Sequence, residues 1–337
     1  MAMLTIRDVI NQTLAAQMRK DQRVVLIGED VSGNAGGTGE DDAFGGAMGL
    51  YKGLVGEFGR NRVIDTPISE AAFIGAAAGA ACAGLRPVAD LMFVDFIGVC
   101  FDQIYNQMAK FRYMFGGKSE TPLVVMAMVG AGLRAGAQHS QMLHPLLTAI
   151  PGLKVVMPSN AYDAKGLFAQ AMQEEDPVFF LSHKALFETA CEVPDEDYTI
   201  AFGEASFARE GEDVTVVALS AMVPKAIAVA DRLAGEGISV EVIDPRTTSP
   251  LDIESIIESV EMTGRLVVVD EATKRCSLAA DIAAQVGEAA FSSLKAPIKC
   301  VTSPHTPVPF APDLEDAFVP NEGDIEAAIR STLGGSA

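Results

Sequence analysis

Short apolar runs alternate along this chain with segments in which apolar residues recur every three or four positions, as they do on one face of a helix. The first such helix is expected over residues 5–20, with Ile6, Val9, Ile10 and Leu14 on one face. Strands are expected at residues 24–27, 62–65, 88–92, 123–126, 154–157 and 178–182. This alternation predicts an α/β fold in which helices cover both faces of a parallel sheet.

A second, shorter series follows an acidic, proline-bearing stretch at residues 188–198. Its strands are expected at 214–219, 238–243, 266–269 and 298–302, and its helices at 222–234, 253–260 and 278–286. We therefore expect two parallel-sheet-based domains, residues 1–190 and 200–335, with a boundary near 188–203. The glycine-rich stretch 28–46 is expected to be a long loop of the first domain, and such loops usually serve a function.

Composition and charge narrow the class of protein. The chain has 25 Lys and Arg against 45 Asp and Glu, a net charge of −20, which argues against binding to nucleic acid or to anionic membranes. Its first residues lack the plan of a signal peptide, and its longest apolar run, residues 71–85, is shorter than the ~20 residues that span a bilayer. Five widely spaced cysteines are expected to be reduced thiols. These features favour an acidic cytoplasmic enzyme or enzyme subunit.

Several familiar motifs are incomplete or missing. Gly130, Gly132 and Ala135 have the spacing of a dinucleotide-binding loop, but that loop needs an acid about 20 residues later. No Asp or Glu occurs from residue 121 to 162, so nicotinamide binding is the least favoured reading. The chain also has no HExxH, no His/Cys cluster with metal-ligand spacing and no GxSxG elbow.

A carboxylate, Glu70, stands at the head of a segment made almost entirely of small residues. In "TPISEAAFIGAAAGAACAG", residues 66–84, 11 of the 14 residues after Glu70 are Ala or Gly. One explanation is that Ser69 caps a helix and Glu70 complements its dipole, worth ~0.3–1 kcal/mol. The other is that Glu70 lies at the carboxyl end of a strand, where α/β folds place ligands, and that the small face admits a ligand or another backbone.

The longer stretch "TPISEAAFIGAAAGAACAGLRPVADLMFVDF" resembles the segment that defines the beta subunit of the thiamine-diphosphate-dependent first component of 2-oxo-acid dehydrogenase complexes. The resemblance continues in order through "FDQIYNQMAKFRYMFGG", "AGAQHSQ", "PGLKVVMPSNAYDAKGL", "VIDPRTTSPLD" and "TPVPFAPDLEDAFVP". It covers almost the whole chain and is most similar to the acetoin-cleaving branch. It implies a transketolase-like pyrimidine-binding domain followed by a transketolase C-terminal domain.

The resemblance also implies roles for individual residues. Glu70 would share a proton with a ring nitrogen of the thiamine aminopyrimidine and favour its imino tautomer. Ile68 and Phe96 would surround that ring, with Phe96 stacked on it; without the resemblance, Phe96 would be interpreted as a core aromatic. His139 would orient the substrate or acyl-lipoyl group and assist proton transfer, although a lone histidine is more often structural.

The remaining histidines carry no role that the resemblance implies. His144 and His183 are expected to be structural, and His305 is assigned no role. Met126 stands where relatives usually carry Arg, which leaves the inter-subunit ion pair at that point open.

Metal sites are also implied by the resemblance. The family often binds a monovalent cation, potassium in particular, through main-chain carbonyl groups. The matching positions here are Leu123, Ala171, Met172, Glu174 and Asp176. The chain lacks the Gly-Asp-Gly motif that holds magnesium and diphosphate in complete thiamine enzymes. The resemblance therefore implies that an alpha subunit supplies the magnesium site and that the two chains share the cofactor.

The implied assembly is a heterotetramer of two alpha and two beta subunits. The C-terminal domain would support pairing with a second beta subunit and docking to a lipoyl-bearing acyltransferase. The expected reaction is cleavage of acetoin with transfer of the acetyl unit to a lipoyl group. Pyruvate or branched-chain 2-oxo acids are the alternative substrates within the family. A non-catalytic assembly subunit, with Glu70 only capping a helix, is the alternative of another class.

Overall fold

The computed structural model describes residues 1–32 and 45–334. Residues 33–44, which belong to the predicted glycine-rich loop, and residues 335–337 lie outside the described part. The chain divides into two compact units. The first unit comprises Met1–Val129, Leu146–Ser182 and Leu186–Ala201, and the second comprises Gly130–Pro145, His183–Ala185 and the chain from Phe202 onward. The second unit therefore includes two segments that come before the boundary expected from the sequence.

The first unit is built on a parallel sheet with strands in the order β6-β7-β5-β4-β2-β3. These strands are β2 (Val24–Gly28), β3 (Val63–Asp65), β4 (Arg86–Phe93), β5 (Val124–Val129), β6 (Lys154–Val156) and β7 (Val178–His183). β2 pairs in parallel with β3 and β4, β4 with β5, and β6 with β7. Every residue of β5 and β7 is buried, as expected for central strands covered on both faces.

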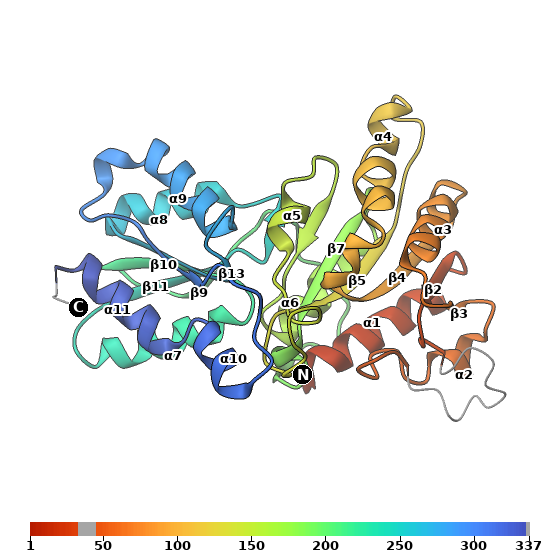
Figure 1. Ribbon diagram of the computed structural model, residues 1–337, viewed down its shortest axis with the longest axis horizontal. Helices are drawn as coiled ribbons and strands as arrows, with labels where there is room; N and C mark the ends of the chain where they lie inside the picture. Colours follow the sequence, from red (N-terminus) through yellow and green to blue (C-terminus); the bar gives the residue numbers. More distant parts are fainter. Residues whose placement is uncertain (33–44, 335–337) are drawn as a thin grey trace. The chain divides into compact units, whose positions relative to one another are not determined.

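Helices complete the first unit (Figure 1), together with a small two-stranded sheet. The helices are α1 (Ile6–Lys20), α2 (Leu54–Phe58), α3 (Glu70–Cys82), α4 (Phe111–Met114) and α6 (Ala161–Ala171), and α5 (His144–Thr148) belongs to this unit from Leu146 onward. β1 (Ala2–Thr5) pairs antiparallel with β8 (Ala190–Val193). Helix α1 starts with a capping box between Thr5 and Asp8, and such a cap typically contributes about 1 kcal/mol. Helix α3 packs against β4 and β2, which places its first residue at the edge where parallel strands end.

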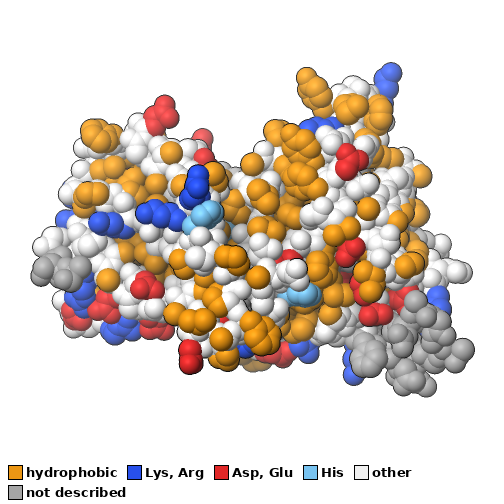
Figure 2. Space-filling model, viewed as in Figure 1, with side chains coloured by type: hydrophobic (Ala, Val, Ile, Leu, Met, Phe, Trp, Pro, Cys, Tyr) orange, Lys and Arg blue, Asp and Glu red, His pale blue; other side chains and the backbone are white. Residues whose placement is uncertain are grey.

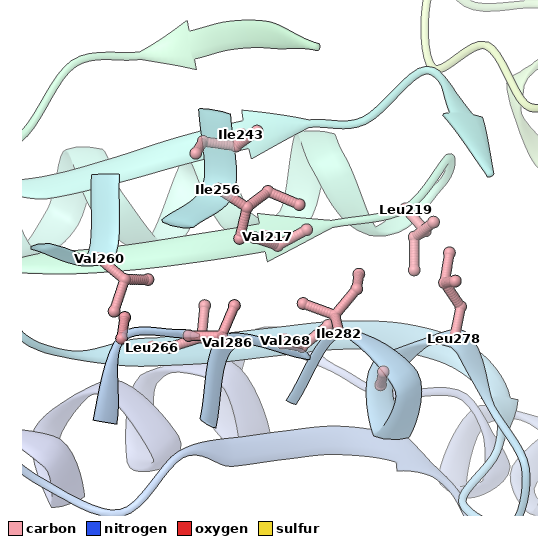
Figure 3. Packing of buried hydrophobic residues seen from close by; sticks show 12 residues of the cluster. Val217, Leu219, Ile243, Ile256, Val260, Leu266, Val268, Leu278, Ile282 and Val286 are labelled. Carbon is pink, nitrogen blue, oxygen red and sulfur yellow. The ribbon is translucent and has the colours of Figure 1, made fainter. Parts of the chain in front are cut away.

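The second unit has a sheet in the order β14-β13-β10-β11-β9, in which only β9 runs antiparallel among the described strands. The strands of this sheet are β9 (Ser206–Arg209), β10 (Val214–Ala218), β11 (Val240–Asp244), β13 (Leu266–Thr273) and β14 (Lys299–Ser303), and the short strand β12 (Thr247–Ser249) is not part of it. Its helices are α7 (Met222–Ala234), α8 (Ile253–Thr263), α9 (Leu278–Ala289), α10 (Pro312–Phe318) and α11 (Glu322–Thr332). Figure 3 shows one core layer, where Val217 and Val268 of the sheet meet Ile256 and Ile282 of the helices.

The predicted fold class is confirmed, because each unit is an α/β structure on a largely parallel sheet. All the strands and helices expected from the apolar pattern are present, with bounds that differ by a few residues. Within residues 1–32 and 45–334, no helix combines the length and the apolar character needed to cross a membrane.

Candidate active site

Glu70 is the first residue of α3, directly after the short connection from β3. The Thr66 amide in this connection donates a hydrogen bond of 3.0 Å to the Gly28 carbonyl oxygen at the end of β2. Ser69 occupies the N-cap position, but its side chain makes no capping hydrogen bond. The hydroxyl cap that would explain this sequence as a simple helix start is therefore not formed.

The Glu70 carboxylate is buried without a partner in the described chain. Only 7% of the residue is exposed. No hydrogen bond or ion pair joins its carboxylate to another group within residues 1–32 and 45–334. An ionised carboxylate removed from water without a partner is costly. A proton donor or cation from outside the described residues would offset that cost, so this carboxylate has the features of a ligand-binding group.

The negative charge of Glu70 acts on two neighbouring groups. Burial raises the pKa of Glu29, and the charges of Asp30 and Glu70 raise it further. Burial also raises the pKa of the Cys100 thiol to about 12, with a further contribution from the charge of Glu70. The surroundings of Glu70 thus disfavour additional negative charge and favour a ligand that is positive or that donates a proton.

Phe96 and Ile68 lie in the same unit as Glu70. Phe96 belongs to the 3₁₀ turn Val94–Gly98, is partly exposed, and packs edge-on against Phe93 with ring centroids 5.7 Å apart. The Cys100 thiol, whose pKa is raised in part by the charge of Glu70, donates to the Phe96 carbonyl oxygen at 3.7 Å. Cys100 therefore links the surroundings of Glu70 and Phe96. Ile68 is 77% exposed, so its apolar side chain is free to contact a ligand.

The small residues of α3 have two different environments. A Cβ atom added at Gly75 would lie 3.1 Å from the Gln103 Cγ, so a glycine lets the segment Gln103–Met108 approach this helix. A Cβ atom added at Gly79 would meet no described atom within 4 Å. The packing within the described chain therefore accounts for only part of this small-residue face.

His139 lies in the second unit, in the connection between β5 and α5, and is partly exposed. Its amide donates to the Gly136 carbonyl oxygen at 3.2 Å, and its own carbonyl oxygen accepts a hydrogen bond from the Lys184 ammonium group. The backbone at His139 is thus held from both sides while its imidazole keeps some access to solvent.

Two other histidines pair with acidic residues that are adjacent in β13. His144 is fully buried, with Nε2 3.4 Å from the Asp270 carboxylate, and His183 Nε2 lies 2.8 Å from the Glu271 carboxylate. His305 is exposed, with Nδ1 3.4 Å from the Thr273 hydroxyl. The burial of His144 and His183 suits the structural roles expected for them.

Arg86 contacts two of the carbonyl groups expected to bind a monovalent cation. Its guanidinium group donates to the Met172 and Glu174 carbonyl oxygens, in each case at 2.8 Å. A positive charge is thus already present among these oxygens. A second cation at the same carbonyl groups would be repelled by it, unless the Arg86 head group moved away.

The remaining expected cation ligands also accept hydrogen bonds in the described structure. The Leu123 carbonyl oxygen accepts from the Val178 amide at 2.9 Å, as part of the sheet, and the Ala171 carbonyl oxygen accepts from an amide in the turn after α6. The Asp176 carboxylate pairs with Arg112. Oxygens of the right chemical type are therefore present, and the Leu123 and Ala171 carbonyl groups each already accept a hydrogen bond.

Three acids were not singled out from the sequence, although a signal was present: Glu29 is partly buried, and Asp90 and Glu271 are buried. Glu29 directly follows the apolar run of β2, and Asp90 and Glu271 interrupt the apolar strands β4 and β13. An acid inside or at the end of a strand that is buried on both faces needs a specific reason, because burial of charge is costly. That rule would have found all three.

Comparison with known proteins agrees with this architecture. Residues 2–189 match the family described as the transketolase pyrimidine-binding domain, and residues 203–325 match the transketolase C-terminal domain. Among solved structures, the inactive beta4 tetramer of a split-gene transketolase matches with a TM-score of 0.76 at 23% identity over 99% of both chains. A transketolase from Leishmania mexicana matches with a TM-score of 0.70 at 16% identity, over 99% of this chain and 46% of that one. These two structures show the fold alone.

Curated relatives are similar over nearly the full length. The chain is 57% identical to the beta subunit of an acetoin:2,6-dichlorophenolindophenol oxidoreductase of Cupriavidus necator, over 98% of both chains. It is 54% identical to the corresponding Bacillus subtilis subunit, over 98% of this chain and 97% of that one. A pyruvate dehydrogenase E1 beta subunit of Bacillus subtilis is 40% identical over 99% of both chains. The chain therefore belongs to the family of beta subunits of the thiamine-diphosphate-dependent first component of 2-oxo-acid and acetoin dehydrogenases.

Proposed function

We propose that this chain is the beta subunit of a thiamine-diphosphate-dependent acetoin dehydrogenase, which cleaves acetoin and passes the acetyl unit to a lipoyl group. The acetoin branch of the family is favoured by sequence identity. The two relatives named for acetoin are 57% and 54% identical, whereas those named for pyruvate and 2-oxoisovalerate are 40% and 41% identical. The active-site role is carried by the buried Glu70 carboxylate, which has no partner within the described residues.

Glu70 would hold a proton shared with a ring nitrogen of the cofactor's aminopyrimidine. Its carboxylate is buried, so a hydrogen bond to that nitrogen would form in a site of low dielectric and be stronger than in water. Its backbone is the first turn of a 13-residue helix, so the carboxylate needs little reorganisation to receive the ring. When bound, thiamine diphosphate supplies the electron sink that allows cleavage of a bond next to a carbonyl carbon.

Ile68 and Phe96 would hold the pyrimidine ring in place. Ile68 offers an exposed apolar side chain two residues before Glu70. Phe96 is positioned by its edge contact with Phe93, and it is not one of the fully buried core aromatics. An aromatic ring stacked on the pyrimidine would fix its plane and exclude water on one side.

His139 would act on the substrate side. Its imidazole is partly exposed, as a group that meets a substrate or an acyl-lipoyl arm must be. The imidazole nitrogens can donate and accept hydrogen bonds, so His139 is suited to orient a carbonyl or hydroxyl oxygen and to transfer a proton to or from it.

An alpha subunit would complete the site. The chain has no Gly-Asp-Gly motif, so magnesium and the diphosphate would be bound by that partner. The segment around α4 exposes apolar side chains, as Figure 2 shows over that region, and these are Val99, Tyr105, Tyr113, Met114 and Phe115. An exposed apolar surface of this kind suits a protein partner. We place the chain in a heterotetramer of two alpha and two beta subunits that docks to a lipoyl-bearing acyltransferase.

The monovalent cation site stays a prediction. Leu123, Ala171, Met172, Glu174 and Asp176 supply oxygens of the kind that potassium prefers, but Arg86 already supplies a positive charge to two of them. Potassium binding would therefore require the Arg86 side chain to share or leave these carbonyl groups.

The test is reconstitution with the alpha subunit from the neighbouring gene. The purified tetramer is assayed by dye reduction on acetoin, pyruvate and 3-methyl-2-oxobutanoate, with and without thiamine diphosphate and magnesium. We expect cofactor-dependent reduction with acetoin as the preferred substrate. A preference for either 2-oxo acid would overturn the choice of branch. Absence of cofactor-dependent turnover with all three substrates, in a folded tetramer, would favour an assembly subunit instead.

A further inference from the structure

The connection that carries His139 has an unusual backbone. Between the end of β5 and the start of α5, four positions have positive φ: Gly130 at +84°, Gly132 at +109°, Arg134 at +55° and Gly136 at +77°. No strand or helix is formed there, so the sheet ladder does not hold this loop in shape. Backbone hydrogen bonds join Gly130 to Gln141 and His139 to Gly136, and side chains of the second unit add further contacts to the loop. We refer to residues 130–141 as the His139 loop.

Glu271 of β13 holds the start of the His139 loop. Its Oε1 accepts a hydrogen bond of 2.7 Å from the Ala131 amide, and its Oε2 lies 2.8 Å from His183 Nε2. Burial alone would raise its pKa, but the charge and hydrogen bond of His183 hold the pKa of Glu271 below its ordinary value. Gly130 allows this arrangement, because a Cβ atom there would collide with the His183 ring.

Glu315 of α10 holds the next part of the loop. Its carboxylate, fully buried, accepts hydrogen bonds from the Gly132 amide and from the Arg134 guanidinium group, the latter at 3.1 Å. Two buried carboxylates thus bind successive amides, Ala131 and Gly132. Hydrogen bonds from amides to charged groups are shorter and stronger than those between neutral groups.

Lys184 reaches His139 itself. It is only 3% exposed, although lysine is rarely buried unless it is paired. Its ammonium group donates to the carbonyl oxygen of His139. Lys184 directly follows His183, the partner of Glu271, so one short segment contacts both the start and the end of the His139 loop.

We propose that Lys184 is a positioning residue for His139: its buried ammonium group fixes the His139 backbone, and Glu271 and Glu315 fix the loop before it, so that the imidazole is presented in one orientation. This inference rests on the proposed role of His139 in the reaction. Lys184 touches no reacting atom and acts only through His139. Small displacements of catalytic groups are expensive, because a shift of about 1 Å can reduce turnover by up to ~10²-fold.

The test uses the assembled alpha–beta tetramer and five variants. Lys184→Met keeps most of the length of the side chain and removes the donor, whereas Lys184→Arg keeps a donor and should retain most of the turnover. Lys165→Met is the matched control, because the partly buried Lys165 also donates to main-chain carbonyl oxygens, those of Pro194 and Glu196 in the first unit. His139→Ala, alone and combined with Lys184→Met, completes a double-mutant cycle.

The expected result is a loss of turnover of roughly tenfold or more for Lys184→Met, little change for Lys165→Met, and no further loss when Lys184→Met is added to His139→Ala. Loss of turnover that is equal in both backgrounds would overturn the proposal, because Lys184 would then act independently of His139. Unchanged turnover in Lys184→Met would overturn it as well.

Hydrogen exchange of residues 130–141 provides a readout that is independent of activity. Faster exchange of these residues in Lys184→Met, but not in Lys165→Met or Lys184→Arg, supports the proposal that Lys184 holds the loop. Unchanged exchange counts against it. If His139→Ala alone keeps full turnover, the proposed role of His139 fails, and exchange still decides whether Lys184 holds the loop.

Discussion

The Asp90 carboxylate lies beside the Tyr51 hydroxyl inside the first unit, where both side chains are buried. Burial raises the pKa of Asp90 to about 7, against the opposing effects of the Met92 amide, which donates at 3.2 Å, and of Tyr51. The folded protein therefore binds a proton at Asp90 more tightly than the unfolded chain, whose aspartates titrate near ~3.9. This contribution is fully present below about pH 4 and is lost as the pH rises through about 7.

Asp90→Asn should therefore stabilise the protein at high pH. The amide is uncharged at every pH and has nearly the same size and shape as the carboxylate. We expect the mutant to gain stability relative to the parent as the pH rises from about 5 to 8, by an amount on the order of 2–4 kcal/mol. Thermal melts of both proteins across this range provide the measurement. A difference in melting temperature that does not change with pH would show that Asp90 is not protonated in the folded state at pH 5.

Glu70→Gln should separate the catalytic role from a helix-start role. Gln keeps the size of the side chain but cannot take up a proton from the cofactor ring, so turnover of the assembled enzyme should fall by ~10²–10⁴-fold. Stability should be unchanged or higher, because a buried charge without a described partner is removed. A charge that only complemented the helix dipole would give the opposite pattern, a stability loss of under about 1 kcal/mol with near-normal turnover. Turnover at saturating thiamine diphosphate and a melt of the same preparation are needed.

The isolated chain should bind thiamine diphosphate weakly or not at all, because it lacks the Gly-Asp-Gly motif for magnesium and diphosphate. Calorimetric titration of the purified chain with cofactor and magnesium tests this, with the alpha–beta tetramer as the positive control. Micromolar binding by the isolated chain would show that the diphosphate site lies within it.

Limited proteolysis should cut the chain between residues 188 and 203, in the acidic, proline-bearing stretch. The fragments should nevertheless stay associated under native conditions, because residues 130–145 and 183–185 belong to the second unit although they precede the cut. Size-exclusion chromatography of the cleaved protein, followed by a denaturing gel, measures both effects. Resistance of this stretch, with cleavage elsewhere, would argue against the expected boundary.

Potassium should stabilise the Arg86→Met variant more than the parent protein. In the parent the Arg86 guanidinium donates to the Met172 and Glu174 carbonyl oxygens, and in the variant these oxygens are freed for a cation. Melting temperatures in potassium chloride and in choline chloride at equal ionic strength give the comparison. A large potassium effect in the parent would mean that the cation and Arg86 bind together.

The parts of the fold that could be predicted from the sequence are those that depend on the local order of apolar and polar residues. β5 reads "VVMAMV" and is buried throughout, and the helical period of α1 marks its buried residues. Helices α10 and α11 were not predicted, although Pro312 at the start of one and the Asn321–Asp324 capping box of the other are recognisable signals.

In the candidate site, too, only the features that depend on local sequence could be predicted. Glu70 could be found because a carboxylate before a run of small residues is a local feature. The hydrogen bonds that hold the His139 loop could not be predicted. Ala131 and Glu271 are 140 residues apart in the sequence, and Gly132 and Glu315 are 183 residues apart. Periodicity and spacing carry no information about such pairs, which form only when the second unit folds.

The second unit is made of separate segments of the chain, and this affects how domains can be exchanged between related subunits. A chimera joined near residue 200 would combine the His139 loop of one parent with the Glu271 and Glu315 carboxylates of the other. Any mismatch in loop backbone would leave two buried acids without their amides, and each such loss is costly. A hybrid that keeps the second unit intact would take residues 130–145, residues 183–185 and the chain from residue 202 onward from the same parent. The segment to exchange is therefore discontinuous in the sequence.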